Sequence, residues 1–331
     1  MASVGAVHPA DTGLQPPSQV ASAAAPAVTV RRRQLEPGRT PKALGPFFAL
    51  ASWAPGLIER VGRLVLPVIP VFLPQVRRST RLNAHRIFGR KLTISEQKLF
   101  TRNVVRSFFL MVIDMARAAR IADNSTLADR LVSQTHGEPE YAAIRRSGRG
   151  AVLVSAHFGS FEAGLAALRR VEPLVHVVFK RDQSAYFERL RARLRRSLGV
   201  REAPIDDGLS TWLSLRDALL RGEVVVLHGD RAVPGQRSTP VPFLNGTLLI
   251  PTGPVKLARL TGCPIVPVFA IRREDGHHDI YLAPPIEPGD ASSVGPDHAV
   301  VALAKAIESV VREHPHQWLV LDAAFEEDHR E

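Results

Sequence analysis

The chain has 331 residues, enough for one large domain or two ordinary ones. Its 43 lysines and arginines exceed its 32 aspartates and glutamates, which gives a formal net charge of +11 and favours an anionic partner. Aromatic residues make up only 6% and lie in apolar stretches, whereas nucleic-acid binders often interleave them with basic residues. We therefore expect an acidic membrane surface or an acidic carrier as partner, and no nucleic acid. Cys263 is the only cysteine, which excludes an internal disulfide.

The first part of the chain divides into a tail and an apolar segment. Residues 1–42 are rich in Ala, Pro, Ser and Gln, a composition typical of a flexible, disordered tail. Residues 43–58 and 64–74 carry no charge, but prolines interrupt both stretches and neither reaches the roughly 20 residues of a membrane-spanning helix. Because basic residues flank them, we expect residues 43–94 to form a membrane-associating segment that lies in one leaflet. Packing on the main domain and a single span are the alternatives.

Residues 95–331 have the alternating pattern of an α/β domain. Ser95 is the predicted N-cap of a helix that continues to residue 121. From residue 150 onward, short apolar runs alternate with stretches of helical periodicity. The predicted strands are residues 151–156, 175–180, 223–230, 264–273 and 278–286, and the predicted helices are residues 161–171, 185–199, 211–222, 253–262 and 297–314. Strands that are apolar on both faces and separated by helices indicate a mostly parallel central sheet flanked by helices.

The stretch AHFGSFEAG places a histidine at the end of the first of these strands and a glutamate five residues later. Ligands bind at the carboxyl ends of strands in such sheets. Gly159 permits a tight turn, which would bring His157 against Glu162 in the first turn of the next helix. A carboxylate bonded to one imidazole nitrogen fixes the tautomer and makes the other nitrogen a base for an alcohol or amine. The alternative is that both are incidental surface residues.

The helix start after His157 supplies further candidates. Backbone N–H groups near Gly159 and Ser160 are candidate oxyanion donors. Neither Ser155 nor Ser160 lies in a nucleophile-elbow motif, so the pattern favours direct acyl transfer to a bound acceptor over a covalent route. The spacing of His157 and Glu162 is not that of a zinc-binding helix, and we expect no metal.

Four segments in register resemble the lysophospholipid acyltransferase superfamily, and most closely the bacterial lipid A biosynthesis lauroyl/myristoyl acyltransferase-like family. They are AHFGSFEAG, GEVVVLHGDRAVPGQRSTPVPFLNG, IPTGPVKLARLTGCPIVPVF and HPHQWLVL, and the similarity spans about residues 55–325. The resemblance implies an O-acyltransferase that moves a fatty acyl chain from an acyl carrier protein or coenzyme A thioester to a hydroxyl or amine of a lipid or glycolipid. It also implies no cofactor, and a place at the cytoplasmic face of the bacterial inner membrane.

The resemblance also assigns roles to residues. It implies that His157 is the general base and that Glu162 is its orienting partner. It places Asp230 and Arg231 in the same cleft, where Arg231 would bind a phosphate and Asp230 would hold it in place; a surface ion pair is the alternative. The turn expected to border the acyl chain contains Phe243, Asn245 and Gly246.

A basic stretch over residues 180–201 begins with Lys180 and Arg181. Its leucines recur at helical spacing, so the predicted helix has an apolar face and a basic face. We expect the basic residues to contact anionic headgroups or an acidic carrier protein. A solvated charged surface is the alternative.

The end of the chain departs from the family pattern. It reads LVLDAAFEED, apolar and acidic, where lipid A acyltransferases commonly have an aromatic- and arginine-rich tail. The acceptor is therefore open between glycolipids, phosphatidylinositol mannosides, ornithine lipids and polyketide-type lipids. A non-catalytic lipid-binding protein of the same fold is the competing class of function.

Overall fold

The computed structural model describes residues 53–118, 124–181, 185–232, 235–290 and 297–329. The chain divides into two units, Met1–Arg33 and Gln34–Glu331, and all described residues belong to the second. The predicted flexible tail, residues 1–42, and the first ten residues of the predicted membrane-associating segment lie outside the described residues.

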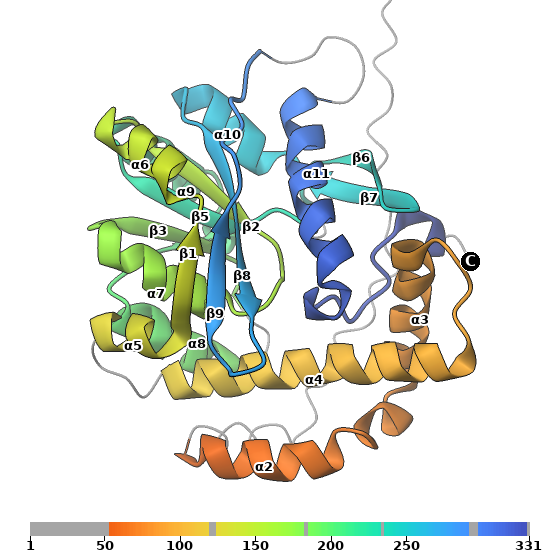
Figure 1. Cartoon of the computed structure of the whole chain (residues 1–331). Helices are drawn as coiled ribbons and strands as arrows, with labels where there is room; N and C mark the ends of the chain where they lie inside the picture. Colours follow the sequence, from red (N-terminus) through yellow and green to blue (C-terminus); the bar gives the residue numbers. More distant parts are fainter. Residues whose placement is uncertain (1–52, 119–123, 182–184, 233–234, 291–296, 330–331) are drawn as a thin grey trace, which may run out of the picture. The chain divides into compact units, whose positions relative to one another are not determined.

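The centre of the second unit is a seven-stranded sheet (Figure 1) with the order β1-β9-β8-β2-β5-β3-β4. Five neighbouring strands, from β8 to β4, run parallel, while β9 is antiparallel to β8 and carries β1 parallel to itself. The mostly parallel sheet predicted from the sequence is confirmed. The strands are β1 (Val132–His136), β2 (Ala151–Ser155), β3 (Val175–Phe179), β4 (Arg201–Pro204), β5 (Val224–His228), β8 (Ile265–Arg272) and β9 (His278–Leu282).

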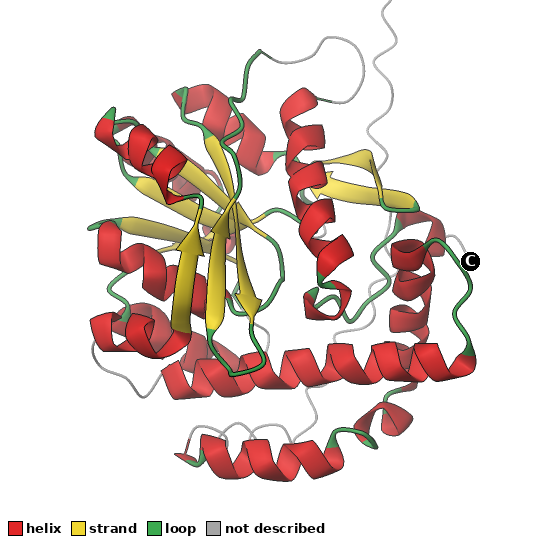
Figure 2. Cartoon of the chain, viewed as in Figure 1, coloured by secondary structure: helices red, strands yellow, loops and turns green. Residues whose placement is uncertain are grey.

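Helices flank this sheet, and a separate two-stranded hairpin lies outside it (Figure 2). The hairpin strands are β6 (Ser238–Phe243) and β7 (Gly246–Pro251). The α-helices are α2 (Pro55–Val65), α3 (Pro74–Phe88), α4 (Ile94–Ala118), α5 (Asn124–Leu131), α6 (Glu138–Arg146), α7 (Phe161–Val171), α8 (Ala185–Ser197), α9 (Leu209–Leu220), α10 (Gly253–Thr261) and α11 (His298–Glu313). Short 3₁₀ turns are η1 (Ile69–Phe72), η2 (Ile205–Asp207), η3 (Pro315–Gln317) and η4 (Glu326–His329).

One predicted helix start was wrong. The long helix α4 begins at Ile94, and Thr93 rather than Ser95 provides the cap. The Glu96 side chain accepts a hydrogen bond from the Thr93 N–H at 2.7 Å, and the Thr93 hydroxyl accepts one from the Glu96 N–H at 3.3 Å. This reciprocal capping box satisfies the N–H groups of Thr93 and Glu96.

The sheet has a hydrophobic core on each face because successive strand residues point to opposite sides. Leu153 of β2 packs in a cluster with side chains of α5 to α8. Its neighbours Val152 and Val154 pack in a second cluster with side chains of α9, α10 and α11. The two layers of helices hold the strands rigidly, so the residues that follow the strand ends are firmly positioned.

The helix α2 packs on the middle of α4. Ile58 and Leu66 are buried against Val105, Phe109 and Ile113. Among the described residues, none of the helices combines the length and the apolar character that crossing a membrane requires.

The turn between β2 and α7 depends on Gly159. Its φ is 55°, in the left-handed region, and a Cβ at this position would lie 1.8 Å from the carbonyl oxygen of Ala270 in β8. Glycine is therefore required both by the backbone angle and by the close approach of the neighbouring strand. This turn carries His157 past the end of β2.

We predict that Gly159→Ala lowers the free energy of unfolding well beyond the cost of the backbone angle alone. The matched control is Gly148→Ala, since Gly148 has a φ of 74° and open space around a new Cβ. Gly148→Ala should lower the free energy of unfolding by about 1–2 kcal/mol. Gly159→Ala should lower it by about 1–3 kcal/mol more, because the new Cβ clashes with the Ala270 carbonyl. Urea unfolding followed by circular dichroism measures both; equal losses would contradict the packing argument.

Candidate active site

His157 stands just beyond the carboxyl end of β2, on a turn that the C-terminal part of the chain clamps in place. The carbonyl of His157 accepts a hydrogen bond from the Leu319 N–H at 2.7 Å, and the Gly159 N–H donates to the Gln317 carbonyl at 3.1 Å. Phe158 forms an isolated bridge with Trp318. The backbone around His157 is therefore fixed from two sides, by the sheet and by residues 317–319.

Asp230 is the carboxylate that contacts the His157 imidazole. The Nδ1 of His157 lies 2.8 Å from Asp230 Oδ1, and the indole Nε1 of Trp318 donates to Asp230 Oδ2 at 3.0 Å. Asp230 is fully buried, whereas 35% of the His157 side chain is exposed. Because an ionised carboxylate only accepts hydrogen bonds, Nδ1 carries the proton and Nε2 has the free lone pair. The arrangement leaves the Nε2 lone pair outside the hydrogen bond to Asp230, on a side chain that is partly exposed.

Asp230 stays ionised despite its burial. Burial alone raises the pKa of this carboxyl, but the attraction of His157, the hydrogen bond from its ring and the nearby charge of Arg231 outweigh it. The pKa of Asp230 is therefore well below its usual range. An ionised carboxylate at Nδ1 fixes the tautomer of His157 and stabilises the imidazolium that forms when Nε2 takes a proton.

A second histidine, His228, stacks on the first. The ring centroids of His157 and His228 are 4.3 Å apart and the ring planes meet at 22°. Burial, and secondly the charge of a protonated His157, lower the pKa of His228 well below its ordinary value. His228 is thus neutral near pH 7, and its Nδ1 has no hydrogen-bond partner in the described part of the chain.

His157, His228 and Asp230 are also the described residues that could hold a metal ion. One ligand atom from each lies within 4.8 Å of the others, and three protein ligands are the usual number at a catalytic zinc. However, the hydrogen bonds from His157 and Trp318 already engage both oxygens of Asp230. The expectation of a reaction without a metal stays a prediction.

Glu162 lies in the first turn of α7, as predicted, but the hydrogen bond at Nδ1 that it was expected to make belongs to Asp230. Its side chain is 5% exposed and makes no hydrogen bond or ion pair with any residue that the structure describes. It lines a small cavity of about 40 Å³ together with His228, Arg191 and Arg195. Glu162 therefore adjoins the imidazole cluster from the side of His228, and its catalytic role stays a prediction.

One of the two expected oxyanion donors is already engaged within the protein, and the role of the Ser160 N–H stays a prediction. The Gly159 N–H is already bonded to the Gln317 carbonyl, so it is not free for a substrate oxygen. Ser160 is fully buried, and its hydroxyl accepts a hydrogen bond from the Ala163 N–H as the N-cap of α7. Both residues fix the geometry of the turn.

The remaining predicted substrate-binding residues do not share one environment. Arg231 is partly exposed and lies 3.7 Å from Asp322, and Asp230 is hydrogen-bonded to His157 and Trp318 rather than to Arg231. Lys180 is exposed, while Arg181 makes a two-point ion pair with Asp207 at 2.7 and 3.2 Å. An anionic ligand would have to replace that surface ion pair.

The predicted border of the acyl chain has a supporting role in the structure. Phe243 is fully buried, with its ring centroid 5.7 Å from that of Trp318. The amide of Asn245 donates to the Arg86 carbonyl at 2.7 Å, and Gly246 begins β7. The hairpin turn is thus anchored to α3, and Phe243 supports the indole that binds Asp230.

A buried, ionised carboxylate that orients a histidine at the carboxyl edge of an α/β sheet is a geometry that general-base catalysis uses. The family model for bacterial lipid A biosynthesis acyltransferases matches residues 50–327, and the chain belongs to this family.

Two curated relatives are similar over part of their length. The phosphatidylinositol mannoside acyltransferase of Mycolicibacterium smegmatis is 26% identical over 178 residues, which are 53% of this chain and 56% of that protein. The protein of the same name from Mycobacterium tuberculosis is 26% identical over 198 residues, 59% of this chain and 60% of that protein. The matched part of the chain thus spans less than two thirds of each relative.

We predict that Asp230, not Glu162, sets the tautomer of His157. Nitrogen-15 NMR of the imidazole should show the proton on Nδ1 in the native protein. In Asp230→Asn, the amide can donate to Nδ1 and leave the proton on Nε2, so the two nitrogen shifts should exchange. Glu162→Gln is the matched control and should leave the tautomer unchanged. A tautomer that follows Glu162 instead would refute the assignment.

Proposed function

We propose that the protein transfers a fatty acyl chain from an acyl thioester, carried by acyl carrier protein or coenzyme A, to a hydroxyl or amine of a lipid acceptor. The observation that supports this most directly is the hydrogen-bonded series Trp318–Asp230–His157 at the end of β2. It stands in a chain that belongs to a lipid acyltransferase family. His157 is the general base in this proposal.

The chemistry follows from the geometry of His157. Its Nε2 takes the proton of the acceptor hydroxyl as the oxygen attacks the thioester carbonyl carbon. A carbon–oxygen bond forms, the tetrahedral intermediate collapses, and the carbon–sulfur bond breaks. The leaving thiolate then takes the proton from the imidazolium, which returns His157 to its starting state. Asp230 stabilises the imidazolium between these two proton transfers.

The acceptor favoured by the relatives is a glycolipid. Both similar proteins are named as acyltransferases of phosphatidylinositol mannoside, in which a sugar hydroxyl is an available nucleophile. A sugar hydroxyl keeps its proton at neutral pH, so it needs a general base to become a nucleophile, and a histidine oriented by a buried carboxylate can supply one. Lipid A precursors and the other lipids considered above remain the alternatives.

Peripheral association with a membrane belongs to the same proposal. The helix α2 buries one side on α4, yet apolar side chains are exposed on α2, on η1 and between them. Leu57, Leu64, Val68 and Phe72 are 54%, 81%, 51% and 76% exposed. A nearby groove of about 840 Å³ is lined by Arg77, Arg78, Arg81, Lys98 and Arg102. Apolar anchors beside basic residues suit an anionic leaflet. The cytoplasmic face of the bacterial inner membrane is the location we expect.

We predict that His157→Ala lowers acyl transfer by about 10²–10⁴-fold, because general-base catalysis contributes that much. The assay follows transfer from a labelled acyl thioester into extracted lipid, and circular dichroism checks the fold. His277→Ala, an exposed histidine in the turn after β8, is the matched control and should keep native turnover. Near-native turnover in His157→Ala would exclude the mechanism. Full biological activity in a His157→Ala, Glu162→Gln double variant would favour the non-catalytic lipid-binding protein.

The membrane surface can be tested separately. We predict that Leu64→Glu with Phe72→Glu abolishes most binding to sedimented vesicles that contain anionic lipid, since two exposed apolar anchors become charged. Leu260→Glu is the control, because Leu260 on α10 is 72% exposed yet lies outside the α2–η1 segment. Equal binding of both variants would contradict the assigned surface.

A further inference from the structure

Three basic residues form a stripe along α4. Lys98, Arg102 and Arg106 are each four residues apart, which places them on one face of the helix, and all three are exposed. Their side chains make no hydrogen bond or ion pair with any residue that the structure describes. Like charges at this spacing destabilise a helix, so an anion that lies against the stripe would stabilise it.

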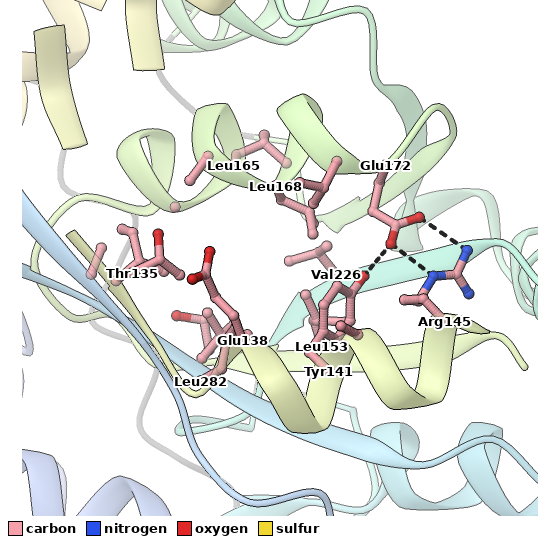
Figure 3. A pocket seen from close by; sticks show the side chains of 18 of the residues that line it. Thr135, Glu138, Tyr141, Arg145, Leu153, Leu165, Leu168, Glu172, Val226 and Leu282 are labelled. Carbon is pink, nitrogen blue, oxygen red and sulfur yellow. Dashed lines mark hydrogen bonds and ion pairs between the residues drawn. The ribbon is translucent and has the colours of Figure 1, made fainter. Parts of the chain in front are cut away.

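Two other arginines that line cavities are already paired. Figure 3 shows Arg145 at one end of the cavity between α6 and α7, where it donates to the buried Glu172 at 2.7 and 3.0 Å. In a cavity of about 600 Å³ that the stripe also lines, Arg272 of β8 donates to the buried Asp114 at 2.9 Å. The charges of the stripe have no such carboxylate among the described residues.

The acidic residues that line the cavity of about 600 Å³ are mostly engaged as well. Glu59 is paired with Arg117 at 2.5 Å, and Asp275 with Arg273 at 3.4 Å. Glu274, in the turn after β8, is the third acidic residue of the lining. Four arginines therefore face three acids in this cavity, and the two arginines of the stripe are the charges left for a ligand.

The stripe runs past three cavities. Arg106 lines one of about 160 Å³ together with Gly159 and Gln317, at the turn that carries the catalytic histidine. Arg106 and Arg102 both line the cavity of about 600 Å³. Arg102 and Lys98 line the groove of about 840 Å³ beside η1. Because neighbouring cavities share lining residues, they form a row along α4 from the groove to the catalytic turn.

The two ends of this row differ in chemistry. The groove beside η1 is lined by Val71 and Leu99 as well as by basic side chains. The cavity at the other end is lined by asparagine, serine and histidine side chains, among them His316. Burial, followed by the charges of His314 and Arg106, lowers the pKa of His316. The charge of Arg106 is therefore felt beside the catalytic turn. An amphiphile fits such a row with its apolar part at η1 and its polar part at the turn.

We propose that the stripe binds the phosphate group of the acceptor lipid, and that the acceptor is a phospholipid with the reacting group in its headgroup. The inference rests on the proposed acyl transfer and names the acceptor of the same site. The acyl tails lie at η1, the phosphate lies against Arg102 and Arg106, and the headgroup extends to the turn that carries His157. Guanidinium groups donate paired hydrogen bonds to phosphate oxygens, which is the recognition that this position requires.

Binding of dihexanoyl phosphatidylglycerol, below its micelle concentration, tests the stripe directly. Isothermal titration calorimetry on the full chain measures the Kd, and dihexanoylglycerol, which lacks the phosphate, is the comparison ligand. Arg102→Gln with Arg106→Gln should weaken binding of the phospholipid about 10- to 100-fold, because hydrogen bonds between charged groups are lost. The double variant should leave binding of dihexanoylglycerol unchanged.

The matched control is Arg130→Gln with Arg237→Gln, which removes the same charge from two exposed arginines outside the three cavities. This control should bind the phospholipid as the native chain does. An equal loss in both double variants, or equal affinity of the native chain for the two ligands, would overturn the proposal. Circular dichroism checks the fold, and Arg102→Gln alone keeps the test decisive if the double variant does not fold.

Two further measurements decide where the phosphate comes from. Weaker binding of coenzyme A by the double variant, with unchanged binding of the phospholipid, would assign the stripe to the acyl donor and overturn the proposal. Loss of binding to sedimented anionic vesicles, with undiminished binding of the monomeric phospholipid, would make the stripe a membrane contact only. That result would also overturn the proposal.

Acyl transfer separates this inference from the proposed function. Transfer with an unchanged KM for a phospholipid acceptor in the double variant would overturn the stripe as an acceptor site and leave the acyltransferase standing. Phosphate-dependent binding that the double variant loses, in a native chain that transfers no acyl group, would support the site and overturn the enzyme.

Discussion

The paired carboxylate of Asp230 is the interaction on which the rest of the site depends. A fully buried, ionised group must have its oxygens satisfied, and each oxygen has one partner, His157 or Trp318. Removing one partner of a buried charge costs about 3–5 kcal/mol. The same two hydrogen bonds join three parts of the chain, since His157 follows β2, Asp230 follows β5 and Trp318 follows α11. The imidazole of His157 is therefore oriented by contacts that form when these three parts of the chain come together.

Support for Asp230 extends outward through Trp318. Its ring packs against Phe243 of the hairpin and Phe325 near the end of the chain, with centroids 5.7 and 6.2 Å away. Both phenylalanines are fully buried. The hairpin and the C-terminal segment, which lie outside the central sheet, thus hold the indole N–H against the carboxylate. Phe243 thus supports the site through Trp318, and the role of the hairpin turn in bordering the acyl chain stays a prediction.

Four of the five parallel strands, β8, β2, β5 and β3, were predictable because they are short apolar runs that alternate with helices. The strands β1, β4, β6 and β7 were not predicted, and for β1 and β6 the reason is visible in their residues. Four of the five residues of β1 are polar and none is fully buried. The strand β6 contains Pro240 and Pro242, which normally argue against a strand. The partner of His157 needed knowledge of strand order. Ser155 pairs with His228, so His157 and Asp230 both stand two residues beyond a matched pair, although 73 residues separate them in the chain.

Spacing along the chain favoured Glu162 as the partner of His157, but the neighbouring strands bring Asp230 to its Nδ1. That Asp230 is the partner has an electrostatic consequence. When His157 takes a proton, the new positive charge lies against a stacked imidazole. A charged neighbour would oppose that step, whereas burial keeps His228 neutral. Because His228 carries no positive charge, the negative charge of Asp230 acts on the His157 imidazolium alone. In the proposed mechanism, His157 is therefore the member of the stacked pair that accepts the proton, while His228 stays neutral.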